Sequence, residues 1–365
     1  MKHLNTYITE YIIKKKLDEP IDSENYYKYC PKSKGELKDT INKLMKQDIY
    51  DFNCIDTSNI TDMSNLFDLG LDYINKNFDV SEWDVSNVAN MSHMFYHCVN
   101  FDCDLSNWDV SNVKYMDNMF NNCHYFKGKG LDKWDVSKVE NMSQMFDSCE
   151  RFDCNLSNWD VSKVKDMSIL FNECYKFKGK GLENWNVSNV ENMRYMFYDC
   201  NKLDINLSGW DVSKVENMQH MFYHCTNFKG NGLENWDVSN VTNMMSMFED
   251  CANFDCDLSG WNVDNITDMT LMFDSCIKFK GKGLENWNVS NVTKMVNLFA
   301  NCENFDCDLS KWNVHKVENM SGMFFYCTKF KGIGLEKWNV KKVKDMSSMF
   351  EECTSIKKLP SWYEE

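Results

Sequence analysis

The chain has 365 residues, a net charge of −15, and only two arginines, Arg151 and Arg194, among its 40 basic residues. An acidic chain without clustered arginines lacks the basic face and the bidentate phosphate contacts of nucleic-acid binders, so we expect no nucleic-acid partner. No segment approaches about 18 uncharged apolar residues, which predicts that the chain does not insert into a membrane.

Two helices are predicted at the N-terminus. The apolar face of the first consists of Leu4, Tyr7, Ile8, Tyr11 and Ile12. The second is expected to begin at Ser33-Lys34-Gly35-Glu36, because a serine followed three residues later by a glutamate forms a capping box. Its apolar face would present Leu37, Ile41 and Leu44.

These helices suggest how the chain is divided. We predict that residues 1–53 form a helical N-terminal cap over a first, degenerate coil at Ile55 to Phe67. Residues 54–365 would form a repeat solenoid with a C-terminal capping segment. The first twenty residues contain charged side chains throughout, so no apolar secretory signal is present. The expected location is cytoplasmic, with a virion or the cell surface reached by a non-standard route as the alternatives.

Tryptophan then recurs at nearly constant spacing. The intervals alternate between 25 and 26 residues ten times and end with one of 24. The positions are 83, 108, 134, 159, 185, 210, 236, 261, 287, 312, 338 and 362. Such a period is typical of identical units that stack on their neighbours, which predicts a solenoid of about twelve coils.

One coil is represented by Leu105 to Phe126. The segment LSNWDV alternates apolar and polar residues, which predicts a short strand with Trp108 and Val110 pointing inward. After it, apolar residues follow at intervals of three, three, one, three and three, which favours a helical or 3₁₀ segment. We therefore expect an α/β solenoid in which equivalent side chains, Trp108, Trp134 and Trp159 among them, stack about 4.8 Å apart.

The full period is two coils. Odd coils return through linkers such as FDCDLS, and even coils through longer linkers such as FKGKGL that contain two glycines. The residue after the linker phenylalanine alternates between aspartate and lysine, as at Asp102, Lys127, Asp153 and Lys178. This pattern predicts a ladder of opposite charges above and below each carboxylate, which would fix the register of the coils. At the C-terminus, Pro360 falls in the predicted strand, where proline is tolerated if no further strand pairs.

Cysteine and histidine also recur as columns. Eleven coils carry one cysteine each, from Cys98 to Cys353, and we interpret them as small buried residues, with disulfides or metal binding as the alternative. His93 with His97, and His220 with His224, have a spacing that could hold a metal on a helix, but the two pairs lie five coils apart. We expect no metal, no cofactor and no enzyme activity, because columns do not form one asymmetric catalytic constellation.

Two features of the surface could bind a partner. The column that includes Asp109, Asp135 and Asn186 is either a register ladder with amides bonding between coils or an acidic strip for a basic partner. Exposed aromatic residues at variable positions are the better candidates, because aromatic side chains dominate binding energy at interfaces. These candidates are Tyr96, Tyr198, Tyr223, Phe325 and Tyr326.

The repeated unit resembles a known family. The pattern W-[DN]-V-S-x-V-x-x-M-x-x-M-F-x-x-C-x-x-F, seen at Trp108–Phe126 and Trp210–Phe228, is similar to the 26-residue bacterial surface protein repeat, a BspA-like leucine-rich repeat. The resemblance covers about 300 residues. It implies a leucine-rich-repeat-like solenoid, found on bacterial surfaces and in protist and large-virus proteins, and it supplies no catalytic residues.

These observations favour a non-enzymatic solenoid used for protein–protein recognition or scaffolding. The alternatives are a structural component of a virion and a cell-surface adhesin of the BspA-like type. The expected partner is a protein that spans several coils rather than a small molecule that fills a pocket.

Overall fold

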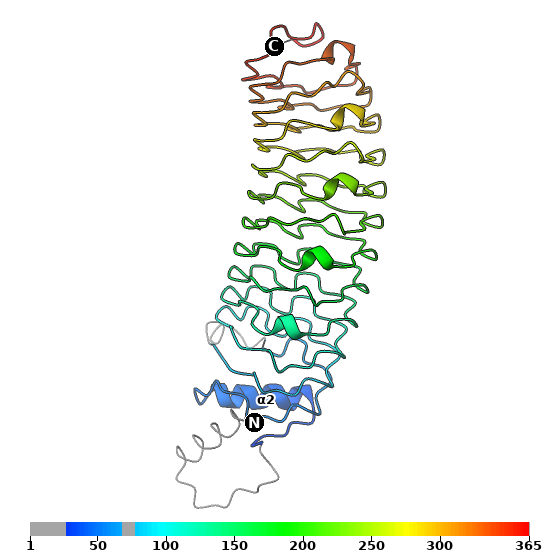
Figure 1. Cartoon of the computed structure of the whole chain (residues 1–365). Coiled ribbons are helices and arrows are strands. Elements are labelled where there is room, and N and C mark those ends of the chain that lie inside the picture. The colour runs from blue at the N-terminus through cyan, green and yellow to red at the C-terminus, as the bar shows by residue number, and fades with distance from the viewer. Residues whose placement is uncertain (1–26, 68–76, 365) are drawn as a thin grey trace, which may run out of the picture.

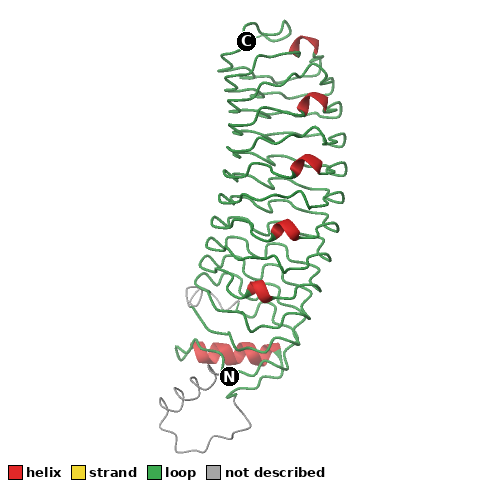
Figure 2. Cartoon of the chain, viewed as in Figure 1, coloured by secondary structure: helices red, strands yellow, loops and turns green. Residues whose placement is uncertain are grey.

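The computed structural model describes residues 27–67 and 77–364, and Figure 1 shows them as stacked coils in one elongated, gently curved solenoid. Helix α2 (Lys34–Met45) lies at the N-terminal end, and the last coil lies at the opposite end. Turns and loops make up nearly all of the described chain (Figure 2).

Helix α2 begins as the capping box predicts. The side chain of its N-cap residue, Ser33, accepts a hydrogen bond from Glu36 N at 3.3 Å, and the Glu36 carboxylate accepts one from Lys32 N at 2.7 Å. Leu37, Ile41 and Leu44 are buried, which confirms the predicted apolar face. The helix predicted at Leu4 to Ile12 lies outside the described residues, so the boundary between residues 53 and 54 stays a prediction.

The predicted strand at LSNWDV is wrong. In its place Asp109 Oδ1 accepts a hydrogen bond from Ser111 N at 3.0 Å, so the column of Asp109 is used within each coil. Contact with the preceding coil is made instead by Asn112, whose Nδ2 donates to Ser86 O at 2.8 Å. No strand longer than an isolated bridge forms in residues 27–67 and 77–364, and the solenoid is therefore not of the α/β type.

Backbone pairing between coils lies instead in the segment that was predicted to be helical. Isolated parallel bridges join Asn90 to Tyr115 and Tyr115 to Asn141. Beyond them every second N–H points to the next coil: His93 N donates to Asp117 O at 2.9 Å, and Phe95 N donates to Met119 O at 2.9 Å. These donors point toward the C-terminal end of the solenoid, whereas bonds at the bridges, such as Lys114 N to Ala89 O at 2.9 Å, run the opposite way.

Two residues per coil with positive φ explain this geometry. In the first full coil His93 has a φ of 57° and His97 a φ of 60°, and the pattern repeats at Asn118 and Asn122 with 56° and 61°. Between them the chain closes three-residue turns, such as Met94 N to Met91 O at 3.1 Å. A left-handed residue at every fourth position ends each helical turn as it forms, so the segment becomes a row of turns.

The two-coil period is confirmed by five 3₁₀ helices that occur in alternate coils. Each follows a glycine with a φ between 90° and 97° in the longer linker. They are η2 (Leu131–Lys133), η3 (Leu182–Asn184), η4 (Leu233–Asn235), η5 (Leu284–Asn286) and η6 (Leu335–Lys337). Figure 1 shows them above one another along one side.

The core is built from stacked columns of identical side chains, as predicted. The rings of Trp108 and Trp134 lie 6.2 Å apart at 3°, and those of Trp134 and Trp159 lie 6.5 Å apart at 2°. Each indole N–H also donates to a carbonyl of the preceding coil, such as Trp134 Nε1 to Leu105 O at 3.2 Å. The tryptophan column therefore joins the coils by both packing and hydrogen bonds.

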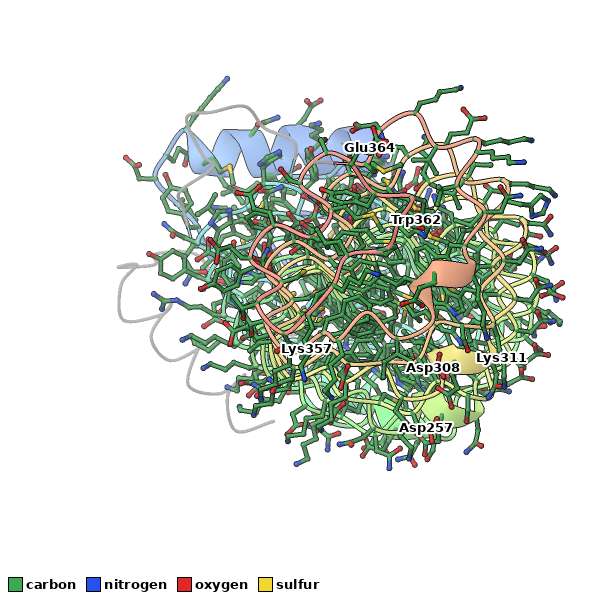
Figure 3. The ribbon with its side chains drawn as sticks, turned by 90° about the horizontal axis from the view of Figure 1, so that it is seen from above. Asp257, Asp308, Lys311, Lys357, Trp362 and Glu364 are labelled. Atoms are coloured by element: carbon green, nitrogen blue, oxygen red, sulfur yellow. The ribbon has the colours of Figure 1, made fainter. Side chains whose placement is uncertain are left out.

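The predicted ladder of opposite charges exists as separate pairs. Each lysine binds the aspartate of the preceding coil in the pairs Lys127–Asp102, Lys178–Asp153, Lys229–Asp204, Lys280–Asp255 and Lys331–Asp306. The expected second contact, to the following aspartate, is absent among the described residues. Seen along the axis (Figure 3), Asp257 and Asp308, one two-coil period apart, project from the same edge, whereas Trp362 lies within the outline of the coils.

Candidate functional site

The row of turns forms a surface of the solenoid that varies from coil to coil. We define the variable face as the positions ten, thirteen and fourteen residues after each tryptophan. In neighbouring coils these positions hold Tyr195, Tyr198 and Asp199, and then His220, Tyr223 and His224. The column that includes Asp109 is, by contrast, Asp or Asn in every full coil. These three positions therefore differ from coil to coil, as does the position sixteen residues after each tryptophan, which holds His124 in one coil and Glu150 in the next.

All five aromatic candidates from the sequence lie on the variable face, but they do not form one site. Tyr198 and Tyr223 stack with ring centroids 4.3 Å apart at 7°. Tyr96 lies four coils from Tyr198 toward the N-terminus, and Phe325 lies beside Tyr326 near the C-terminal end, 6.4 Å from its ring. Only Tyr326, at 42 % exposure, is an exposed side chain, and the other four are half-buried, so their predicted exposure is wrong.

Tyr198 and Tyr223 belong to a larger group, which we call the aromatic patch: Tyr195, Tyr198, His220 and Tyr223. The rings of Tyr195 and His220 lie 4.5 Å apart. The imidazole of His220 also lies edge-on to Tyr198 and Tyr223, at 6.3 and 5.9 Å. Sequence reasoning did not choose Tyr195 and considered His220 only as a metal-binding pair with His224, although each precedes a chosen tyrosine by three residues and so shares its turn.

The protonation of the aromatic patch follows from its partial burial. Burial and the nearby Arg194 guanidinium lower the pKa of His220, which favours the neutral ring. The Nδ1 atom of His220 is buried and has no hydrogen-bond partner among the described residues. Burial, together with Tyr223 and Asp199, raises the pKa of Tyr198, so its phenol stays protonated. At neutral pH the rings of His220 and Tyr198 are therefore uncharged.

Carboxylates adjoin the aromatic patch on its C-terminal side. We call Glu249, Asp250 and Asp274 the acidic cluster. It is continuous with the patch, because His224 N donates to Glu249 O at 2.7 Å and Asp250 N donates to Asp274 O at 2.8 Å. Burial, with the charges of Asp274 and Asp250, raises the pKa of Glu249 to about 7. Burial also raises the pKa of Asp274.

Charge pairing differs between the two sides of the solenoid. In the linkers, Asp104 and Asp257 bind Lys129 and Lys282 at 2.7 and 2.9 Å, in addition to the five pairs described above. On the variable face, within the part of the chain that the structure describes, none of eight carboxylates forms an ion pair with a lysine or an arginine. They are Asp147, Glu173, Asp199, Glu249, Asp250, Asp274, Glu351 and Glu352.

The cysteine and histidine columns do not assemble a metal centre. No group of three or more potential ligands occurs in residues 27–67 and 77–364. Cys123 Sγ donates to Phe95 O at 3.1 Å, and Cys149 Sγ donates to Phe120 O at 3.1 Å, a contact repeated along the column. Burial raises the pKa of both thiols well above the usual value, so they remain protonated. The structure describes all seventeen cysteines and contains no disulfide between them.

The histidine pairs lie in the row of turns rather than on a helix. His93 Nδ1 lies 3.7 Å from Asp117, and His224 Nδ1 binds Asp199.

None of the helices in the described residues has the length and hydropathy of a membrane span.

Comparison with known proteins gives one family match. A family model described as "Mycoplasma protein of unknown function, DUF285" matches residues 36–130, 118–231, 203–283 and 272–364. A search of curated proteins finds no significant match.

Three solved structures share some similarity with the chain. A leucine-rich repeat protein from Eubacterium ventriosum ATCC 27560 is 14 % identical over 90 % of this chain and 89 % of its own, with a TM-score of 0.42. The TLR13–ssRNA13 complex is 9 % identical over 87 % and 56 %, at 0.22. The functional domain of InlJ from Listeria monocytogenes is 9 % identical over 75 % and 65 %, at 0.18. With TM-scores below 0.5, none of the three supports a statement about fold or function.

Proposed function

The chain belongs to the DUF285 family of mycoplasma proteins of unknown function, and from this premise we propose that it is a non-enzymatic repeat protein whose variable face binds a protein partner. The observation that carries the proposal is the aromatic patch. Four rings from two neighbouring coils gather on a face that varies from coil to coil, unlike columns such as that of Asp109, which repeat.

The physical argument concerns what each part of the surface is needed for. The column of Asp109 closes turns within coils, and the linker aspartates bind lysines of the next coil, so these columns already stabilise the solenoid. The patch does not repeat from coil to coil. The position thirteen residues after the tryptophan, where Tyr198 and Tyr223 lie, holds Asn121 in one coil and Ala300 in another. Half-buried tyrosines supply large, rigid contact areas at low entropic cost, as is typical of binding hot spots.

A structural role is the alternative. A virion component or a cell-surface adhesin of the BspA-like type would need only the repeated columns, which give length and rigidity. Such a role gives no reason for the aromatic patch. The BspA-like assignment and the cytoplasmic location both remain predictions.

The test is capture of partners by immobilised protein from extracts of the cells that produce it. Parent protein is compared with a double variant, Tyr198→Ala and Tyr223→Ala, and the bound proteins are quantified by mass spectrometry. Alanine suits this position, since Ala300 occupies it three and four coils away. We expect a defined set of proteins to be lost from the variant, because the two stacked rings form the centre of the patch.

The control changes a matched pair on the opposite side of the same coils. Asp204→Asn with Lys229→Gln removes an exposed linker ion pair and should leave capture unchanged. Equal capture by all three proteins would contradict the proposal and favour the structural role.

A further inference from the structure

We propose that the aromatic patch and the acidic cluster together form a docking surface for a basic, extended segment of a protein partner, with an arginine or lysine side chain held between the rings and the carboxylates. This inference rests on the proposed function and states the chemistry of its partner.

The first step of the argument is that tyrosine rings on this protein already bind cations. The chain has two arginines, and both lie over tyrosine rings of its own surface. The Arg151 guanidinium is 4.1 Å from the ring centroid of Tyr125, and that of Arg194 is 5.3 Å from Tyr195. Such contacts arise because the face of an aromatic ring carries partial negative charge. The stacked pair Tyr198 and Tyr223 has no such cation over it among the described residues.

The second step concerns the rest of the patch. His220 is held neutral by its burial and by Arg194, so its ring does not repel an incoming cation. Its Nδ1 atom is buried and lacks a hydrogen-bond partner in the described chain. Arg194 itself lies over Tyr195, on the preceding coil from His220 and Tyr223, and leaves the side toward Glu249 without an arginine.

The third step is charge complementarity. Glu249, Asp250 and Asp274 adjoin the patch and form no ion pair with a lysine or an arginine in the described part of the chain. Burial, with the charges of Asp274 and Asp250, keeps the pKa of Glu249 near 7, and a cation brought beside the three carboxylates would relieve their mutual repulsion. The adjacent residues Tyr223 and His224 are not lysine or arginine, so they do not compete with an incoming cation for these carboxylates. A row of uncompensated carboxylates also attracts a basic segment from a distance.

The geometry of the surface selects an extended segment rather than a compact ligand. Patch and cluster occupy four successive coils, from Tyr195 to Asp274. Coils stack at about the spacing of strands, so the four span roughly 15–20 Å. An extended peptide covers this distance in about five to six residues.

The experiment measures binding of a fluorescein-labelled nine-residue peptide that alternates arginine and glycine. Fluorescence anisotropy at low salt gives the Kd for the parent and for two double variants, Tyr198→Ala with Tyr223→Ala and Glu249→Gln with Asp274→Asn. We expect each pair to weaken binding about three- to tenfold. Added salt should weaken binding to the parent, because the carboxylates lie near the surface.

Matched controls separate this site from general attraction to an acidic protein. Asp211→Asn with Asp237→Asn likewise removes two carboxylates, from nearby coils, and asparagine occupies that column at Asn186. Tyr115→Ala with Tyr125→Ala removes two exposed tyrosines elsewhere. Both controls should bind within about twofold of the parent. Thermal unfolding confirms that every variant is folded.

Each result decides the inference. Equal weakening by the Asp211 and Asp237 control would overturn it, because attraction would then depend on net charge alone. It is also overturned if a peptide with glutamate in place of arginine binds as tightly, or if spermine binds but the peptide does not. Should the Tyr198 and Tyr223 variant lose its cellular partners while no basic peptide binds, the proposed function stands and this partner chemistry is wrong.

Discussion

At the scale of single residues, each core tryptophan does two things. Trp210 is 4 % exposed, its indole N–H donates to Leu182 O at 2.8 Å, and its ring stacks on Trp236 at 6.3 Å. The repeat shows that this position points inward. The carbonyl that accepts the N–H could not be predicted, because it belongs to a neighbouring coil whose backbone path follows from the turns.

We predict that Trp210→Ala lowers the free energy of unfolding by about 3–5 kcal/mol, because it leaves a large cavity and an unpaired carbonyl. Urea denaturation followed by circular dichroism provides the measurement. Trp362→Ala is the control, since that ring is half-buried at the end of the stack and should cost less. Equal costs would show that the column does not act as a continuous core.

Glu249 leads to a prediction about pH. The folded protein holds its proton up to about pH 7, whereas an unfolded glutamate releases it near its ordinary value of 4.5. Between these values folding binds a proton, so this contribution to stability is full below pH 4.5 and is lost as the pH rises to 7. Relative to Glu249→Gln, the parent should lose on the order of 1 kcal/mol over this range, a figure reduced for solvent screening.

The measurement is the difference in unfolding free energy between the parent and Glu249→Gln at pH 4.5, 6 and 8. Asp211→Asn is a control whose difference from the parent should stay nearly constant over this range. Hydrogen bonds from Ser213 lower the pKa of Asp211, so its contribution is present above the unfolded value of 3.8 and is lost only at lower pH. If the difference between the parent and Glu249→Gln does not change with pH, Glu249 titrates normally and the prediction is wrong.

At the scale of elements, the row of turns is where sequence reasoning failed. Apolar spacings of three and four fit one face of a helix. The same side chains point inward whether the segment forms a helix or a row of turns. The distinction lies in residues with positive φ, such as His93, Asn118 and Ile169. Residues of many different types occupy these positions, so residue type does not reveal a positive φ in the sequence. Because the segment forms turns instead of a helix, alternate N–H groups of the turns point along the axis to the next coil. The coils therefore pair through the turns rather than through the predicted strand.

The glycines of the longer linkers make a testable case. Gly232 has a φ of 90°, and a Cβ there would lie 2.2 Å from Ser208 N. Gly232→Ala should lower the unfolding free energy by more than the roughly 1–2 kcal/mol of left-handed strain, because backbone atoms must also move. Thermal unfolding of the variant would show the loss.

Gly35→Ala is the matched control in helix α2. A Cβ at that position would lie 4.0 Å from Ser33 Oγ, in ordinary contact. Alanine is also favoured in helices by about 0.5–1 kcal/mol, so stability should stay equal or rise. A Gly232→Ala variant as stable as this control would mean that the linker adopts another conformation.

At the scale of the whole molecule, two coils rather than one are the unit of the solenoid. Deletion of residues 255–305 removes one full period and joins Phe254 to Asp306, so aspartate and lysine still alternate. Deletion of residues 255–279 removes one coil and places the Lys229 and Lys280 coils together, with two glycine-containing linkers in contact. We predict that the first variant unfolds cooperatively near the parent temperature.

The second deletion should melt at clearly lower temperature or aggregate, because it loses ion pairs and brings like charges together. Circular dichroism melting and size-exclusion chromatography compare the two. If each coil is an independent unit, the shorter deletion should be tolerated better than the longer one. That outcome would contradict the two-coil period.

The repeat period, the inward columns, the capping box of α2 and the alternation of linkers were all determined by the sequence. Each depends on local chemistry repeated many times, and repetition removes the ambiguity of a single residue. The aromatic patch was only half visible, since Tyr198 and Tyr223 stood out as binding residues, whereas Tyr195 did not and His220 stood out only as part of a possible metal pair. Their convergence, the unpaired carboxylates beside them and the turns that present them were decided by the tertiary structure. The reason is physical: which side chains meet across coils depends on backbone φ values and stacking register, and neither is encoded in the spacing of apolar residues.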